Sequence, residues 1–323
     1  MKKKEINVLS LFDGMSCGRI ALERTGIEVD NYFSSEVDKY AIQIADKNYP
    51  QDTINRLGDV CDIDTSRLPK IDFLIGGSPC QGFSMAGKLK GSSTSCGKDV
   101  TTLEHYLVLK EMGFSFDGQS YLFWEYVRIL TELRKVNPYI KFMLENVRIT
   151  KKWLPMFNEA MGVEPIIINS SLLSAQNRVR YYWTNIDNIN QPKDKGLVLS
   201  DIVENIYKCG NLRMCELKDF DKKSVCHHIA NATDIKGNES IKRVYAGSGK
   251  SPTITTCAGG HREPKILNGS DTYRKLTPLE CERLQTVPDN YTLGVSNSQR
   301  YKMIGNGWTV DVISHIFRNI ILH

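Results

Sequence analysis

Apolar runs alternate with amphipathic segments through the first half of the chain. The runs are typical of buried strands, and the segments between them are typical of helices. Strands are expected over residues 5–12, 31–38, 71–77 and 141–147. Helices are expected over residues 18–26, 38–48 and 120–136. This alternation predicts an α/β fold built on a mostly parallel sheet.

Residues able to do chemistry fall at the carboxyl ends of those strands. Asp13 and Glu36 follow the first two expected strands. Cys80 follows the third, and Glu145 lies near the end of the fourth. Parallel α/β sheets bind their ligands at this edge. We therefore expect these side chains to belong to one site.

The pattern weakens in the second half of the chain, where polar residues and glycines interrupt it. Helical periodicity returns at residues 277–285 and in the amphipathic segment 310–322. The change predicts a catalytic and cofactor-binding domain, completed by the end of the chain, and a second, smaller domain. The expected bounds are 1–184 with 300–323 for the first domain, and 185–299 for the second. Residues 88–118 break the α/β alternation and are expected to form an insertion.

Composition narrows the class of protein without identifying it. The 323 residues carry a formal net charge of +5, which permits a nucleic-acid partner without requiring one. The nine cysteines are irregularly spaced and form no CxxC pair, so neither a disulfide framework nor a metal site is expected. No segment is expected to span a membrane. These features predict a cytoplasmic protein, which we expect to be a monomer.

The stretch FDGMSCG after the first expected strand predicts a ligand-binding turn. Gly14 and Gly18 are expected to let the backbone approach the ligand closely. Glu36 lies where an acidic residue binds a ribose diol, and Asp59 is placed to accept from an adenine amino group. The G-x-x-x-G spacing differs from the G-x-G-x-x-G of dinucleotide-binding proteins. S-adenosylmethionine is therefore favoured over NAD, and an NAD-dependent oxidoreductase is the weaker alternative.

Six motifs make the sequence closely resemble the DNA (cytosine-5)-methyltransferase family, of the bacterial and phage type. In chain order they are FDGMSCG, SPCQGFS, LENV, QNRVR, RKLTPLECERLQ and GNGWTV. The resemblance implies a Rossmann-like S-adenosylmethionine-dependent methyltransferase domain plus a smaller target-recognition domain. It also implies methylation of carbon 5 of cytosine in a specific double-stranded DNA sequence, by base flipping, in a bacterial cell or phage-infected host.

A cysteine suits this chemistry, because a soft thiolate can add to carbon 6 of cytosine and later leave. By the resemblance, Cys80 is the nucleophile and forms a covalent adduct with the base. Glu145 must hold a proton near N3 of the ring when the base arrives. Arg180 resembles the arginine that binds the cytosine carbonyl oxygen. Asn146 resembles a support for the turn after Glu145.

The resemblance also assigns binding residues. The expected cofactor-binding residues are Phe12, Gly14, Gly18, Glu36, Asp59, Leu122 and Asn306. Gln176 and Arg178 resemble supports for a loop and for the DNA backbone. In the stretch 251–265, Thr255 and Arg262 are expected to contact DNA, and Arg262 can bind either a guanine edge or a phosphate.

Two other readings of the function stay open at this point. The same chemistry could act on RNA, although the sizeable second domain favours DNA. The chain could also be a catalytically silent DNA-binding relative. The presence of Cys80, Glu145 and Arg180 together argues against that second alternative.

Overall fold

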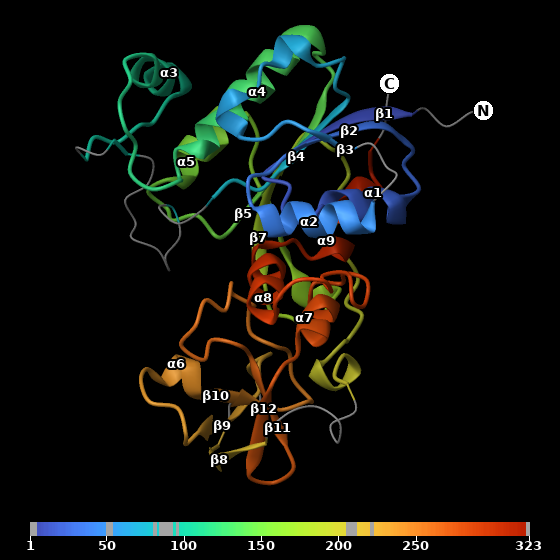
Figure 1. Ribbon diagram of the computed structural model, residues 1–323, viewed down its shortest axis with the longest axis vertical. Helices are drawn as coiled ribbons and strands as arrows, with labels where there is room; N and C mark the ends of the chain where they lie inside the picture. Colours follow the sequence, from blue (N-terminus) through green and yellow to red (C-terminus); the bar gives the residue numbers. More distant parts are fainter. Residues whose placement is uncertain are drawn as a thin grey trace.

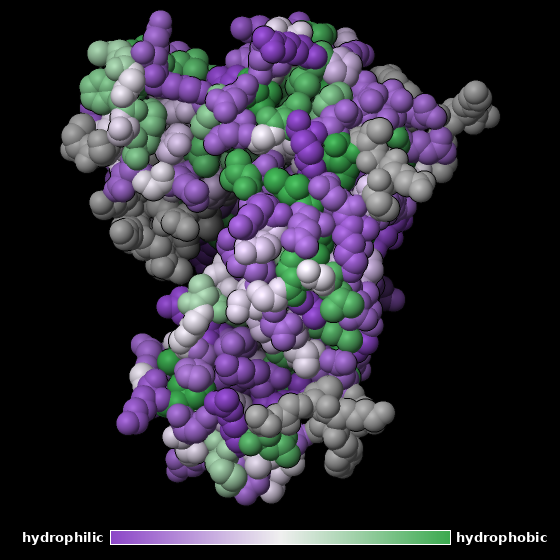
Figure 2. Space-filling model, in the orientation of Figure 1, coloured by the Kyte–Doolittle hydropathy of each residue, from purple (hydrophilic) through white to green (hydrophobic). Residues whose placement is uncertain are grey.

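A large sheet and a small closed barrel make up the fold of the computed structural model (Figure 1). The described residues are 5–49, 54–79, 83, 93–94, 97–204, 212–219 and 223–320. The sheet lies in the upper part of Figure 1 and the barrel in the lower part, with α7 and α8 between them. In the view of Figure 2, hydrophilic residues cover most of both parts.

The large sheet has seven strands in the order β3-β2-β1-β4-β5-β7-β6. Their bounds are β1 (Ile6–Leu11), β2 (Val29–Ser35), β3 (Ile54–Arg56), β4 (Phe73–Gly76), β5 (Lys141–Asn146), β6 (Ile166–Asn169) and β7 (Val179–Thr184). The first five strands in this order are parallel, and β7 runs antiparallel to both of its neighbours. The predicted mostly parallel α/β sheet is therefore confirmed.

Helices cover both faces of this sheet, as its buried central strands β1 and β4 require. The helices are α1 (Cys17–Thr25), α2 (Lys39–Asn48), α4 (Leu122–Val136), α5 (Leu154–Met161) and α9 (Val310–Phe317). On one face α1 and α9 pack together, and Phe317 of α9 meets Phe73 of β4 edge to face at 4.8 Å. On the other face Phe123 of α4 stacks on Phe157 of α5 at 3.9 Å. The end of the chain thus returns to the first sheet, as expected.

The second sheet closes into a five-stranded barrel in the order β10-β11-β12-β8-β9. Its strands are β8 (Arg213–Leu217), β9 (His228–Ala232), β10 (Arg243–Tyr245), β11 (Lys265–Asn268) and β12 (Thr272–Lys275), with α6 (Glu239–Lys242) before β10. A separate small core that includes Val244 and Tyr273 fills it. A smaller second domain is thus present, and the bounds 185–299 stay a prediction.

The segment RKLTPLECERLQ attaches the barrel to α7 (Pro278–Leu284). Thr277 and Glu280 form a reciprocal capping box, and Pro278 occupies the first helical turn, where its missing N–H costs nothing. Arg274 at the end of β12 binds both carboxylate oxygens of Glu280, at 2.7 and 2.8 Å. This buried, bidentate pair holds the barrel in a fixed orientation on the helix.

The expected insertion is described at residues 93–94 and from residue 97 onward, and it contains α3 (Leu103–Glu111). This helix projects beside α4 in Figure 1. Lys110 Nζ lies 2.6 Å from Oε1 of the buried Glu125 on α4, and Tyr106 binds the same carboxylate. Within the described part of the chain, no helix is long and apolar enough to cross a membrane.

Candidate active site

Two of the residues expected to act on the base form an ion pair at the carboxyl edge of the sheet. Arg180 Nε lies 3.0 Å from Glu145 Oε1, and each side chain is only 12% exposed. Glu145 lies near the end of β5, whereas Arg180 lies near the beginning of β7. Because β7 is antiparallel to β5, its beginning lies beside the end of β5. The reversed strand therefore creates this pair.

Trp308, for which the motif GNGWTV predicted no role, binds the second oxygen of the same carboxylate. Its indole Nε1 donates to Glu145 Oε2 over 3.2 Å. A buried tryptophan usually finds a hydrogen-bond partner for its N–H. This general preference was the only feature of the sequence that could have indicated a contact for Trp308. Gly77 makes room for the contact, since a Cβ atom there would lie 2.9 Å from Nε1 and 3.0 Å from Oε2.

Asn146 fixes the end of β5 to the segment that leads to the expected nucleophile. Its Nδ2 donates to the carbonyl and hydroxyl oxygens of Ser78, both at 3.2 Å, and its Oδ1 accepts from Val147 N. The described segment ends at Pro79, and Cys80 lies outside the described residues. The role of Cys80 therefore stays a prediction, while the support expected of Asn146 has a structural basis.

The six cysteines of the described residues are poor candidates for a reactive thiolate. They are Cys17, Cys61, Cys215, Cys226, Cys257 and Cys281. Burial raises the pKa of each thiol above its ordinary value, to about 12 for Cys17 and to about 11 for Cys257. Because the thiolate is the nucleophilic form, these side chains are inert near neutral pH.

Asp13 organises the turn after β1 from inside the protein. Four hydroxyl groups donate to its buried carboxylate at 2.6–2.8 Å, and they belong to Ser10, Ser16, Tyr32 and Ser34. This network fixes the backbone that carries Phe12 and Gly14, both of which have positive φ angles near 57°. Asp13 is thus a structural residue of the turn.

The two carboxylates expected to bind the cofactor lie beyond the ends of β2 and β3. Glu36 Oε2 accepts from Gly14 N at 2.7 Å, and its Oε1 accepts from the N–H groups of Val37 and Asp38. Asp59 is exposed and accepts from Cys61 N. Carboxylate oxygens can accept hydrogen bonds from ribose hydroxyls and from an adenine amino group. The partly exposed Phe12 adds an apolar surface, so this set of residues fits S-adenosylmethionine.

The other expected cofactor residues occupy different environments. Leu122 begins α4 and is partly buried, whereas Asn306 is exposed at the end of α8 (Asn297–Asn306). Gly18 is buried in α1, and a Cβ atom there would overlap Cδ1 of Ile75 on β4. Close packing of the helix on the sheet therefore requires glycine at this position, and contact of Gly18 with the cofactor stays a prediction.

Gln176 and Arg178 lie inside the protein, where they join segments that are distant in sequence. Arg178 donates to the carbonyl oxygens of Ile254, Gly305 and Gly307 at 3.1–3.2 Å. Gln176 Oε1 accepts from Ile254 N at 2.9 Å. Both residues are buried, so in this structure they support loops and their side chains are not available to DNA.

Both residues expected to contact DNA in the stretch 251–265 are exposed, as contact with DNA requires. They are Thr255 and Arg262. The backbone of Thr255 packs closely against Gly305 of α8. A Cβ atom at Gly305 would overlap the carbonyl oxygen of Thr255, so only glycine fits there. Across the described ranges, no group of three His, Cys, Asp or Glu side chains could hold a metal ion.

Comparisons with known proteins agree with this geometry. The family described as C-5 cytosine-specific DNA methylase matches residues 6–322. The orphan methyltransferase M.SPBetaI of Bacillus phage SPbeta is 27% identical, with 98% of both chains covered. The type II methyltransferase M.HhaI of Haemophilus parahaemolyticus is 28% identical, with 98% of this chain and 94% of its own chain covered.

Solved structures share the fold at lower identity. A mutant of DNMT2 from Spodoptera frugiperda superimposes with a TM-score of 0.62 at 17% identity, over 97% of this chain and 100% of its own. The methyltransferase EhMeth of Entamoeba histolytica gives a TM-score of 0.63 at 16% identity, over 97% of each chain. At these identities the likeness concerns the fold alone.

Proposed function

Since this chain belongs to the C-5 cytosine-specific DNA methylase family, we propose that it methylates carbon 5 of cytosine within a specific sequence of double-stranded DNA. Family membership makes it an enzyme that uses S-adenosylmethionine. DNA is favoured over RNA because the family that matches residues 6–322 is described as a DNA methylase. The observation that carries the proposal is the carboxylate of Glu145, held between Arg180 and Trp308.

The nucleophile of the proposal is Cys80. It follows Gly77 and Pro79, and Gly77 lies directly against Glu145. The thiolate adds to carbon 6 of the cytosine, and carbon 5 then becomes nucleophilic. S-adenosylmethionine supplies an electrophilic methyl group, which carbon 5 takes from the sulfonium sulfur. Water takes the proton from carbon 5, N3 returns its proton to the Glu145 carboxylate, and the thiolate leaves carbon 6, which restores the aromatic ring.

Glu145 and Arg180 act on the polar edge of the base. Addition at carbon 6 builds negative charge on the ring, which a proton at N3 neutralises. In the free structure Arg180 occupies Oε1 of Glu145. An arriving cytosine offers its carbonyl oxygen to this guanidinium, and the released Oε1 can then carry the proton that passes to N3.

The target base has to leave the double helix to reach this site. The side chain of Glu145 is only 12% exposed, and carbon 6 of a stacked base is covered by its neighbours. Extrusion costs about a few kcal/mol in lost pairing and stacking. Contacts from Thr255 and Arg262, together with the site around Glu145, are the proposed compensation for this cost.

Methyl transfer to matched duplexes tests the proposal. Purified protein, S-adenosylmethionine labelled in its methyl group, and DNA or RNA duplexes of equal sequence would be incubated together. We expect label in DNA only, and bisulfite sequencing of DNA from expressing cells should place it at cytosines in one sequence context. Label in RNA alone, or the absence of label from both duplexes, would contradict the proposed substrate.

A further inference from the structure

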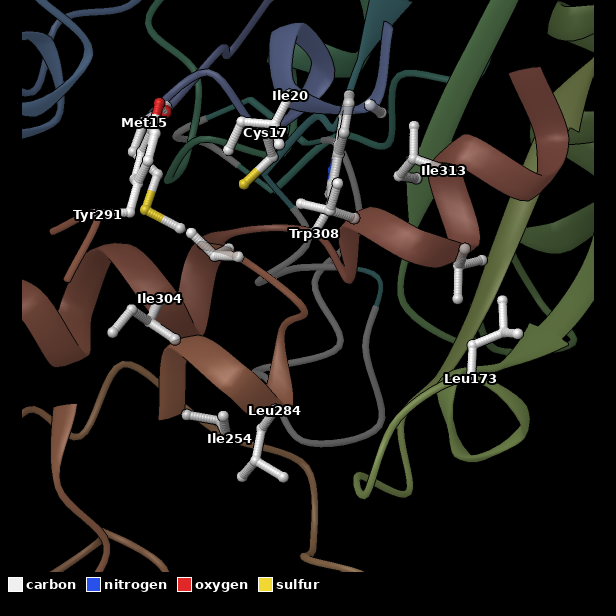
Figure 3. Packing of buried hydrophobic residues seen from close by; sticks show 14 of the residues in the cluster. Met15, Cys17, Ile20, Leu173, Ile254, Leu284, Tyr291, Ile304, Trp308 and Ile313 are labelled. Carbon is white, nitrogen blue, oxygen red and sulfur yellow. Dashed lines mark hydrogen bonds between the residues drawn. The ribbon is translucent and has the colours of Figure 1, made fainter. Parts of the chain in front are cut away.

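The indole of Trp308 is fixed at a junction between three separate parts of the chain. It lies just before α9, and a Cβ atom at Gly18 of α1 would be 3.4 Å from its ring. In Figure 3 the ring stands beside Cys17, whose thiol interacts with the backbone of Trp308. Gly77, after β4, lies against Nε1. Trp308 is 8% exposed, so its N–H is held in one direction by this packing.

That direction places the N–H on one oxygen of Glu145. Trp308 Nε1 binds Oε2, whereas Arg180 binds Oε1. The indole contact is a hydrogen bond, whereas the guanidinium contact is an ion pair at 3.0 Å, and the two partners differ in what they can do later. Arg180 is a long side chain that can exchange Glu145 for the cytosine carbonyl oxygen. The indole of Trp308 packs against Gly18 and Gly77 and cannot move away from Glu145 in the same way. Oε2 therefore keeps its hydrogen-bond donor, while Oε1 loses its ion-pair partner.

An indole N–H can donate a hydrogen bond and cannot accept one. The oxygen that it binds must therefore remain an acceptor. In a protonated carboxyl group the carbonyl oxygen accepts more strongly than the hydroxyl oxygen, so the indole favours Oε2 as the carbonyl oxygen. When Glu145 takes up a proton, that proton is directed to Oε1, the oxygen from which Arg180 departs. Resting on the proposed role of Glu145, we propose that Trp308 is a positioning residue, which fixes the plane of the carboxyl group and directs its proton to Oε1.

The test replaces only the indole N–H. Benzothienylalanine keeps the two fused rings of tryptophan but carries sulfur in place of N–H, and it can be incorporated at position 308. Two other buried tryptophans provide matched controls. Trp124 Nε1 has no hydrogen-bond partner among the described residues, so its replacement measures the cost of the sulfur atom alone. Trp183 Nε1 donates to Asn158 Oδ1 at 2.8 Å, so its replacement measures the loss of a structural hydrogen bond.

Single-turnover methyl transfer, cofactor affinity and thermal stability would be measured for all three replacements. At position 308 we expect the rate of methyl transfer to fall by about tenfold to a hundredfold, the range expected for a hydrogen bond to a charged group. Cofactor affinity should change by less than about twofold. The replacement at position 183 should lower stability without slowing methyl transfer, and that at position 124 should change neither quantity. An unchanged rate at position 308, or an equal fall at position 183, would overturn the inference.

Ordinary variants give a second comparison and separate this inference from the proposed function. Trp308→Phe and Trp183→Phe each keep an aromatic ring and lose the N–H, and only Trp308→Phe should reduce kcat with KM nearly unchanged. Glu145→Gln tests the acid itself. A fully active Glu145→Gln enzyme would remove the proposed acid, whereas an inactive one beside a fully active Trp308→Phe enzyme would remove only the positioning role.

Discussion

Arg180 Nε and Glu145 Oε1 lie 3.0 Å apart on two strands that run in opposite directions. Thirty-five positions separate the two residues in sequence, and the antiparallel pairing of Asn146 with Tyr181 brings them together. Burial, and after it the charge of Glu145, raise the pKa of the neighbouring Tyr182 well above its ordinary value. The phenol therefore stays neutral and adds no charge beside the pair of Glu145 and Arg180.

Cys80→Ala should abolish methyl transfer while leaving the fold and cofactor binding intact. DNA that carries 5-fluorocytosine cannot lose its group at carbon 5, so it should trap a covalent complex with the natural enzyme only. Gel electrophoresis under denaturing conditions measures this complex. Cys61→Ala is the control, because burial raises the pKa of that thiol to about 12, and it should still trap. A covalent complex with Cys80→Ala would assign the nucleophile to another residue.

Arg180→Lys should lower kcat/KM. The expected loss of transition-state stabilisation is about 2 kcal/mol or more, the scale of deleting one oxyanion donor. A lysine ammonium is a single point charge and cannot reproduce the planar guanidinium. Steady-state kinetics with a saturating cofactor measures the loss. Arg24→Lys is a control, because Arg24 pairs with Asp311 on the partly exposed surface of α1 and α9. Equal kcat/KM values for the natural enzyme and Arg180→Lys would place the base elsewhere.

Gly77→Ala should lower kcat through a single added methyl group. The new Cβ would lie 2.9 Å from Trp308 Nε1 and 3.0 Å from Glu145 Oε2, so one of them must move. Gly77 is outside the residues with positive φ, and the substitution therefore adds contact without backbone strain. Gly113→Ala is the converse control, with strain at φ +73° and open space around the methyl group. We expect at least about a tenfold loss of kcat for Gly77→Ala, equivalent to about 1.4 kcal/mol. Full activity would show that the pair tolerates displacement.

Arg262→Gln should weaken DNA binding, whereas Arg178→Met should lower the stability of the fold. The exposed Arg262 should weaken DNA binding when lost, and a phosphate contact would reduce the slope of log K against log salt by about one. The buried Arg178 binds three carbonyl oxygens, so its loss should destabilise the fold by about 3 kcal/mol. Salt-dependent binding titrations and urea denaturation measure the two effects. A stable Arg178→Met protein with a reduced salt slope would make Arg178 a DNA contact after all.

The titration of Lys265 should make the free energy of unfolding increase with pH above about 8. Burial lowers the pKa of this lysine to about 8, whereas an unfolded lysine titrates near 10.5. Between these values the unfolded chain binds more protons than the folded one, so this residue increases the free energy of unfolding as pH rises through that window. Denaturation at pH 8, 9 and 10 should show a smaller rise for Lys265→Met than for the natural protein. Parallel pH curves for the two proteins would contradict the expectation.

Local sequence determined the strands, their order along the chain and the residues at their ends. Apolar runs of strand length predicted β1, β4 and β5 to within a few residues, because burial on both faces demands a nearly continuous apolar segment. β2 was also predicted to within a few residues, although its sequence VDNYFSS is largely polar. The predicted strands also placed Glu36 and Glu145 at the correct edge of the sheet. Glu36 directly follows β2, and Glu145 is the second-last residue of β5. The antiparallel direction of β7 was not predicted, because strand direction depends on pairing with distant residues and not on local pattern.

Tertiary packing decided what several individual residues do. Gly18 lies in a turn that predicted ligand contact, yet close approach of Ile75 explains its small size. Arg178 and Arg180 are two positions apart in one motif, but Arg178 precedes β7 and turns inward to carbonyl oxygens. The sequence motif alone could not separate a loop support from a residue of the site. Exposure and hydrogen-bond partners, which only the folded chain defines, make that distinction.

The contact between Trp308 and Glu145 shows where the sequence alone reached its limit. The two residues are 163 positions apart, and each lies in a motif that was recognisable by itself. Sequence determined the chemical groups that are present, since a carboxylate, a guanidinium and an indole N–H are properties of residue type. The fold decided which donor binds which carboxylate oxygen. That choice depends on the glycines at 18 and 77, which leave the space that the indole fills.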